Sequence, residues 1–276
     1  MQLAYLKMHG AGNRIVVVDQ RESNLPPPPA EKIRLLADDK TGPGFDQLMW
    51  VGSAKNSTTS ASYRIFNADG SECEQCGNGV RCVFWMLARE SDQEKSFTLE
   101  SPAGTIEAIV LDDGRIAVNM GPPEFDPRLV PFSAEAQSDL YPLEVAGTTI
   151  NASVLSMGNP HCVVEVGDLE STDVAALGPA LERHARFPAR TNVGFMQIRD
   201  RDTIDLREYE RGAGETLACG TGACAAVVAG QRLGHLDNEV TVQMPGGQLV
   251  VSWRGETDGV WLTGEAELIS EGTVDL

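Results

Sequence analysis

Basic residues and long apolar segments are scarce in this 276-residue sequence. It carries 22 Lys and Arg against 40 Asp and Glu, which gives a formal net charge of −18. A nucleic-acid-binding protein needs a basic surface to neutralise phosphates, and an anionic membrane surface attracts basic segments. We therefore expect neither a nucleic acid nor a membrane as a partner, which leaves a protein that acts on a small molecule.

Signals for export or for a membrane span are also lacking. The first nine residues contain no basic stretch followed by a long apolar run, so we expect no secretory signal. The densest apolar runs, Cys82–Ala88 and Ala223–Ala229, are too short to cross a bilayer. We expect a cytoplasmic protein whose six cysteines are reduced thiols rather than a disulfide framework.

Motifs for common metal and nucleotide sites are missing from the sequence as well. It has no His-Glu-x-x-His, and its four histidines are scattered. Its Gly-rich segments lack the Lys of a phosphate-binding loop and do not match Gly-x-Gly-x-x-Gly. We therefore expect no metal site and no nucleotide site.

The composition is otherwise that of a globular protein, with 42% hydrophobic residues. Runs of β-branched residues that end in turn residues predict strands, and apolar residues at helical spacing predict helices. The predicted strands are Leu3–Met8, Ile15–Val18, Gln47–Val51, Tyr63–Asn67, Thr203–Glu210 and several short ones between Phe97 and Asn119; the predicted helices are Ala30–Asp39 and Val80–Glu90. Gly121–Pro127 reads as a linker.

After this linker, three short markers recur in the same order. The pairs are Gly12-Asn13 with Gly158-Asn159, Gly44–Gln47 with Gly194–Gln197, and Cys76-Gly77-Asn78-Gly79 with Cys219-Gly220-Thr221-Gly222. A polar residue at a strand end stands nine positions before each cysteine, and Asn13 to Gln47 spans 34 positions against 38 from Asn159 to Gln197. We interpret the pattern as a degenerate duplication, in which two halves face each other across a cleft and each contributes one Cys at a helix start.

Two such cysteines suit the inversion of a stereocentre beside a carboxylate. A helix N-terminus lowers the pKa of a thiol, and the free N–H groups beside a Gly form an anion site. One thiolate can remove the α-proton while the other group, as a thiol, returns a proton to the opposite face. The N–H groups would stabilise the charge that builds on the carboxylate.

Other interpretations of these residues stay open. Free Cys is commonly a small buried residue, which we expect for Cys82, Cys162 and Cys224. Cys73 and Cys76 form a Cys-x-x-Cys that could hold zinc or act in redox chemistry, although no second ligand pair at matching spacing is present. A zinc-binding or ligand-binding module is therefore the non-enzyme alternative.

The motifs together resemble those of the diaminopimelate epimerase family. The resemblance runs from about residue 3 to residue 266, and it is most specific in the segments that surround the two cysteines and the two Gly-Asn turns. These segments are Lys7–Asn13, Gly44–Gln47, Phe66–Glu72, Gln75–Cys82, Ser156–Cys162, Asn192–Phe195 and Glu210–Gly222.

This resemblance implies an α/β fold of two pseudo-symmetric domains, each a mixed, largely antiparallel sheet around a central helix, with the active site between them. The last strand, at about residues 266–276, would return to the first domain, giving domains of 1–120 plus 266–276 and of 121–265. The implied activity is the cofactor-independent interconversion of LL- and meso-2,6-diaminopimelate in lysine and cell-wall precursor synthesis. A homodimer is possible.

The resemblance also assigns roles to particular residues. Cys76 and Cys219 would be the catalytic pair, and His161 and Glu210 would modulate their pKa values. Substrate contacts would fall on side chains and backbone groups of both halves. These residues are Asn13, Gln47, Asn67, Gly77, Asn78, Asn159, Asn192, Glu210, Arg211, Gly220 and Thr221.

The sequence departs from the family pattern at three places. Arg14-Ile15 stands where Asp-Phe is usual, Asp38–Thr41 replaces a polar run with Cys, and Ser270 stands where many members carry an aromatic residue at the dimer contact. Two related chemistries remain as alternatives. One is a proline racemase or hydroxyproline epimerase with the same pair of thiols, and the other is a phenazine-synthesis-like isomerase, whose group lacks the cysteine pair.

Overall fold

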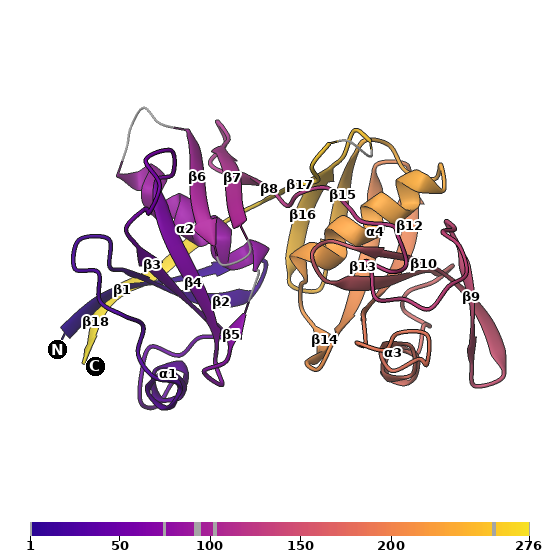
Figure 1. Ribbon diagram of the computed structural model, residues 1–276, viewed down its shortest axis with the longest axis horizontal. Helices are drawn as coiled ribbons and strands as arrows, with labels where there is room; N and C mark the ends of the chain where they lie inside the picture. Colours follow the sequence, from indigo (N-terminus) through magenta and orange to yellow (C-terminus); the bar gives the residue numbers. More distant parts are fainter. Residues whose placement is uncertain (1, 74–75, 91–94, 102–103, 256–257, 276) are drawn as a thin grey trace. The chain divides into compact units, whose positions relative to one another are not determined.

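The computed structural model describes residues 2–73, 76–90, 95–101, 104–255 and 258–275 (Figure 1). The chain divides into two compact units. Unit 1 is Met1–Asn119 with Thr263–Leu276, and unit 2 is Met120–Leu262. The return of the C-terminal segment follows from β18 (Glu267–Asp275), which runs antiparallel to β1 (Gln2–Gly10) along most of its length.

Unit 1 is a mixed sheet in which each strand pairs with its neighbours in a simple order. From β18 the order is β1, β2, β3 and β4, and β4 then pairs with both β5 and β6, after which β7 and β8 follow. Only the β2–β3 and β4–β6 pairs are parallel among these described pairs. The further elements are β2 (Asn13–Asp19), α1 (Ala30–Ala37), β3 (Gln47–Gly52), β4 (Ala61–Asn67), β5 (Glu72–Cys73), α2 (Gly77–Arg89), β6 (Ser96–Ser101), β7 (Gly104–Val110) and β8 (Ile116–Asn119).

Unit 2 repeats this order with β9, β10, β11, β12 and β13, followed by β14, β15 and β16. The parallel pairs, β11–β12 and β13–β15, fall at the same places as in unit 1. The elements are β9 (Tyr141–Val145), β10 (Thr148–Ser156), β11 (Pro160–Glu165), α3 (Val174–Glu182), β12 (Asn192–Asp200), β13 (Thr203–Glu210), β14 (Gly214–Thr216), α4 (Gly220–Arg232), β15 (Glu239–Met244) and β16 (Gly247–Ser252). Strand β17 (Trp261–Gly264) begins in unit 2 and ends in unit 1. The predicted fold class, two pseudo-symmetric α/β units, is confirmed.

A buried helix lies against one face of each sheet. Helix α2 packs on β1, β2, β3, β7 and β8, and helix α4 packs on β10, β11, β12, β13 and β16. Every residue from Gly220 to Gly230 is buried. Because no side of this part of the helix faces solvent, small and mostly apolar residues occur all around it. On the opposite face of each sheet, α1 and α3 each close a second apolar cluster.

The register of the strands corrects one marker of the duplication. Gln47 stands opposite Asn67 across β3 and β4. Val193 stands opposite Tyr209 across β12 and β13, so Asn192 and Glu210 are the next pair in that register. The counterpart of Gln47 is therefore Asn192, and the predicted match with Gln197 is wrong, because the two Gly-Phe markers lie before one strand and inside the other.

The second predicted helix also begins earlier than expected. The sequence predicts Val80–Glu90, whereas α2 starts at Gly77 with Cys76 as its N-cap. Gly77, Asn78 and Gly79 are weak helix formers, but all three are buried, and burial overrides intrinsic propensity. The earlier start places the cysteine at the helix end itself.

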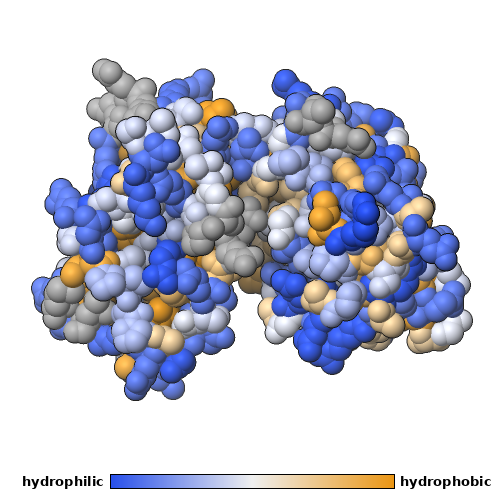
Figure 2. Space-filling model, viewed as in Figure 1, coloured by the Kyte–Doolittle hydropathy of each residue, from blue (hydrophilic) through white to orange (hydrophobic). Residues whose placement is uncertain are grey.

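The described helices are short, and the exposed side chains are mostly hydrophilic, as the composition predicts. None of the described helices is long and apolar enough to cross a membrane. On the face shown in Figure 2, most residues are hydrophilic and the hydrophobic ones are scattered among them. Scattered apolar residues are normal on a folded surface and carry no functional signal.

The loop that leads from α1 toward Gln47 has little free space, which gives a stability prediction. A Cβ at Gly42 would lie 2.5 Å from both Cα and the carbonyl oxygen of Leu36, and neither backbone atom can move aside. Overpacking of this kind costs about 1–3 kcal/mol. We expect Gly42→Ala to lower the urea midpoint of unfolding accordingly. Gly167→Ala is the control, because a Cβ there has no neighbour within 4 Å; equal midpoints for the two variants would contradict the prediction.

Candidate active site

In unit 1, Cys76 lies at the N-cap of α2. Its backbone is extended, with φ −150° and ψ 102°, and its Sγ accepts a hydrogen bond from the amide of Gly79 at 3.3 Å. The amides in the first turn of a helix have no partner within the helix, and the helix dipole adds positive potential there. A thiolate or carboxylate is therefore stabilised at this point, as the sequence predicts for Gly77 and Asn78.

Three amide side chains form a row at the strand ends of the same unit. Asn13 begins β2, Gln47 begins β3 and Asn67 ends β4. Asn13 Nδ2 lies 3.4 Å from Gln47 Oε1, and Gln47 Nε2 lies 3.3 Å from Asn67 Oδ1. The structure thus brings together the three predicted polar contacts of unit 1, which offer both donors and acceptors to a zwitterion.

Arg14, which departs from the family pattern, forms ion pairs beside this row of amides. Its guanidinium lies 2.9 Å from Asp39 and 3.1 Å from Asp46, and its backbone amide donates to Asp46 at 2.8 Å. The two departures from the family pattern, at positions 14 and 39, are therefore partners of each other. Asp46 and Arg14 stand next to Gln47 and Asn13, so the ion pairs tie the starts of β2 and β3 together.

A buried arginine connects the first turn of α2 to the end of the chain. Arg81 is fully buried, and its Nη2 donates to Asn78 Oδ1 at 2.7 Å while its Nε donates to the carbonyl of Glu265 at 3.2 Å. The side chain of Asn78 is thus held by Arg81, which leaves its backbone amide as the group that can serve a ligand.

Unit 2 repeats this arrangement around Cys219, the N-cap of α4. Cys219 is buried, and its Sγ lies 3.4 Å from Thr221 Oγ1. Thr221 Oγ1 also accepts from Asn159 Nδ2 at 3.3 Å. His161 is fully buried, with Nε2 3.0 Å from Asn159 Oδ1. Four of the predicted residues therefore form one connected group in this unit.

Two further predicted substrate contacts, Asn192 and Arg211, are joined by a hydrogen bond to the backbone of Arg211. Asn192 Nδ2 donates to the carbonyl of Pro160 at 3.0 Å, and its Oδ1 accepts from the amide of Arg211 at 3.0 Å. The guanidinium of Arg211 lies 3.3 Å from the carbonyl of Ala189 and is exposed. Asn192 therefore fixes the backbone of Arg211, while the charged end reaches solvent.

Burial controls the protonation of the groups around Cys219. Burial lowers the pKa of His161 to about 3, and the charge of Arg211 acts in the same direction, so the imidazole is neutral. Burial also raises the pKa of Glu210, whose Oε1 accepts from Thr216 at 2.6 Å. The pKa of the Cys219 thiol lies well above its ordinary value because of burial and of the nearby carboxyls of Glu210 and Glu208.

Sequence reasoning missed Glu208. It is fully buried, and it lies on the same face of β13 as the buried residues Ile204 and Leu206. The alternation of buried positions along the strand was the available signal, since a carboxyl falls where an apolar residue is expected. Neither of its carboxyl oxygens has a hydrogen-bond partner among the described residues.

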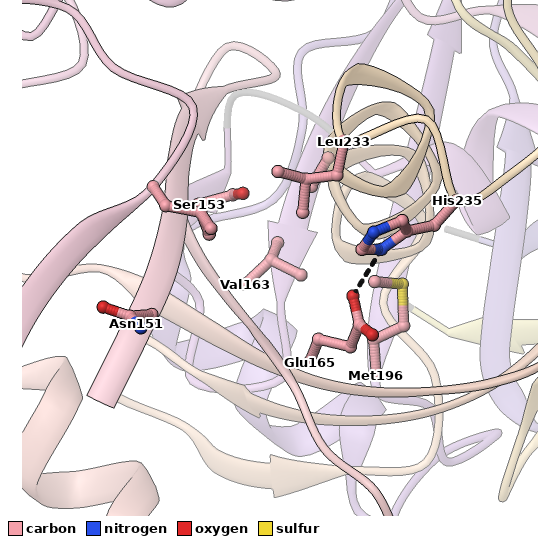
Figure 3. Close-up of a pocket in the computed structure, with 9 residues that line it drawn as sticks. Asn151, Ser153, Val163, Glu165, Met196, Leu233 and His235 are labelled. Atoms are coloured by element: carbon pink, nitrogen blue, oxygen red, sulfur yellow. Dashed lines mark hydrogen bonds and ion pairs between the residues drawn. The ribbon is translucent and has the colours of Figure 1, made fainter. Parts of the chain in front are cut away.

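A separate pocket lies at the other end of α4 (Figure 3). It has a volume of about 140 Å³, and His235 Nδ1 lies 2.9 Å from Glu165 Oε2 at its wall. None of the predicted site residues lines it. Across the described ranges, no group of three or more His, Cys, Asp or Glu side chains is arranged to hold a metal ion. The six cysteines, all of them in these ranges, form no disulfide bond.

Comparison with known proteins adds a family to this geometry. The family model for diaminopimelate epimerase matches residues 5–125 and 153–269. Proteins named diaminopimelate epimerase from Laribacter hongkongensis and Nitrosomonas europaea are 47% and 48% identical to this chain, and each alignment covers 100% of both chains. A solved hydroxyproline epimerase from Agrobacterium vitis, with bound trans-4-hydroxy-L-proline, has a TM-score of 0.72 at 17% identity, covering 100% of this chain and 93% of its own. That likeness shows the fold alone.

The buried imidazole of His161 gives a prediction about pH. We expect it to stay neutral from pH 8 to pH 5, as the Nε2–H tautomer that donates to Asn159, because its pKa is about 3. An unfolded imidazole takes up a proton near pH 6.5, so unfolding is favoured as the pH falls from about 6.5 toward 3. Long-range ¹H–¹⁵N correlation spectra check the tautomer, with His161→Gln used for assignment. A protonated ring in the folded protein at pH 5 would contradict the prediction.

Proposed function

Because the chain belongs to the diaminopimelate epimerase family, we propose that it interconverts LL- and meso-2,6-diaminopimelate without a cofactor. The observation that carries the proposal is the repeated half-site, a cysteine at the N-cap of a buried helix in each of two pseudo-symmetric units. A single half-site offers one acid–base group, whereas inversion needs a group on each face of the α-carbon.

In the proposed mechanism, Cys76 and Cys219 act on opposite faces of the α-carbon. One thiolate takes the α-proton, and the other thiol gives a proton to the opposite face, so that the cysteines exchange protonation states in each turnover. This step requires that the two half-sites bind the same α-carbon from opposite faces. The first-turn amides of α2 and α4 stabilise the charge that the carboxylate gains as the carbanion forms.

We propose that His161 and Glu210 set the protonation of the cysteine in unit 2. Glu210 acts on the thiol directly, because its carboxyl raises the pKa of Cys219. The neutral imidazole of His161 is linked to the thiol through the hydrogen bonds of Asn159 and Thr221, which supports this assignment. Thr216 donates a hydrogen bond to Glu210 at 2.6 Å, and Asn159 Oδ1 lies 3.0 Å from His161 Nε2. His161 is fully buried and Glu210 is half-buried, which limits the access of water that would otherwise compete for the proton.

Diaminopimelate has two amino-acid ends, and only one of them reacts at a time. We propose that the second end is held by the amide row of Asn13, Gln47 and Asn67 together with Asn159, Asn192 and Arg211. Arg is suited to a bidentate grip on a carboxylate, and the amides can serve both the ammonium and the carboxylate. The proposed location of the enzyme is the cytoplasm.

The alternative substrate is proline or hydroxyproline, which the same pair of thiols could invert. The likeness to the hydroxyproline epimerase is one of fold, at 17% identity, whereas the relatives named for diaminopimelate are 46–48% identical over the full chain. Assays with both substrates decide. Turnover of proline or hydroxyproline without turnover of diaminopimelate would refute the proposal.

Each cysteine should be required on its own. We expect Cys76→Ala and Cys219→Ala each to lower kcat/KM for LL-diaminopimelate by about 10²–10⁴-fold or more, the range supplied by one acid–base group. Cys73→Ala is the matched control, since it removes the other thiol of the Cys-x-x-Cys and should leave activity close to that of the unaltered enzyme.

Two results would contradict this prediction. Substantial activity in either Cys76→Ala or Cys219→Ala would exclude the two-thiol scheme. Loss of activity in Cys73→Ala together with stoichiometric zinc in the purified protein would favour a metal-binding module instead. Thermal unfolding of all three variants separates lost chemistry from lost folding.

A further inference from the structure

Glu208 is a buried carboxyl to which the proposed chemistry gives no role. It lies in the middle of unit 2, on β13, with none of its surface exposed. Both oxygens lack hydrogen-bond partners in the described part of the chain. Leaving a polar group buried and unpaired destabilises a fold, so its presence calls for a function.

The carboxyl lies directly beneath the first turn of α4. A Cβ built on Gly222 would be 2.2 Å from Glu208 Oε1, and one built on Gly194 would be 2.7 Å from the same atom. The two glycines therefore leave the space that the carboxyl occupies. Gly222 is the third residue after Cys219, so Glu208 sits under the turn that carries the thiol.

Unit 1 shows that the fold does not need a carboxyl at this place. By strand register, Met49 and Ile65 are a pair that corresponds to Gly194 and Glu208. There the thioether of Met49 fills the space beneath Gly79, at 2.5 Å from a Cβ built on that glycine. The same geometry is thus packed by apolar atoms under Cys76 and by a carboxyl under Cys219.

We propose that Glu208 is a positioning residue that keeps Cys219 in the thiol form, so that in the resting enzyme unit 2 is the half that holds a proton to donate. A carboxyl ionises before a thiol when both share one buried environment. Its negative charge then opposes a second charge on Cys219 through a medium of low dielectric constant. This proposal rests on the proposed two-thiol function.

The other titratable groups around Glu208 do not cancel this effect. Burial, and after it the charge of Glu210 on the same strand, raise the pKa of Glu208, but burial also raises the pKa of Cys219 from a higher ordinary value, so the carboxyl still ionises before the thiol. His161 on β11 is neutral. Burial and the charge of Glu208 raise the pKa of Cys162 on β11 to about 12, so it is a neutral thiol, and Cys224 on α4 is buried. The facing position on β12 is Gly194, and the facing position on β14 is Thr216, so neither supplies a charge.

The test is the rate at which Cys219 reacts with iodoacetamide as a function of pH, measured on the Cys219 peptide by mass spectrometry. We expect Glu208→Gln, which cannot ionise, to raise the rate at pH 8 by about tenfold, equivalent to one pKa unit. The rate for Cys76 in the same samples should not change. Glu215→Gln, which removes an exposed carboxylate paired with Arg207, is the matched control and should leave Cys219 unchanged.

A second variant protects the test against misfolding. Glu208→Ile places the residue that unit 1 uses at this position, so it should fold, with an unfolding temperature at or above that of the unaltered protein, and it should raise the Cys219 rate in the same way. A Cys219 rate within twofold of the unaltered protein in the folded variants would overturn the proposal. The reaction with iodoacetamide needs no substrate. Failure to turn over diaminopimelate would therefore refute the proposed function, and the alkylation rates would still test the role of Glu208.

Discussion

The burial of one helix in each sheet is the constraint on which the rest of the structure depends. Helices α2 and α4 are surrounded by strands, and their first turns consist of small residues packed close to the sheet. Packing of this density leaves no freedom in the position of the helix start. The cysteine at each N-cap is therefore fixed against the strand ends, where the amide and carboxyl side chains lie. The first-turn amides, which have no partner within the helix, lie at the same place.

The two units share this design but differ in charge. Around Cys76 the strand ends carry the amides of Asn13, Gln47 and Asn67, whereas around Cys219 they carry His161, Glu210 and, beneath the helix, Glu208. Symmetry of the backbone supplies a group for each face of a stereocentre. Asymmetry of the side chains sets which group holds a proton, and a reaction that inverts one centre needs both properties. Most of the carboxylates that give the net charge of −18 are exposed.

Much of this could be predicted from the sequence, and the exceptions have physical causes. The two Cys-Gly-x-Gly motifs indicated the helix starts because a reactive thiol and a close backbone approach leave short, local signatures. The match of Gln47 to Gln197 was wrong because strand register depends on pairing between distant segments, which spacing along the chain does not record. Glu208 was missed because acidic residues are usually exposed, so its residue type does not predict burial. Its burial becomes evident only when its neighbours on β13 are known to be buried. The ion pairs of Arg14 with Asp39 and Asp46 join residues 25 and 32 positions apart, and they show how an unusual residue is accommodated.

The central claim is that two thiols, one on each face, exchange a proton with the α-carbon. The most direct measurement is the reaction of LL-diaminopimelate in deuterated water, stopped before equilibrium and analysed by mass spectrometry. The account predicts one solvent deuterium in the meso product and almost none in the recovered LL substrate, because the group that removes the proton is not the group that supplies the new one. Equal deuterium in product and recovered substrate would show a single shared base and would contradict the account.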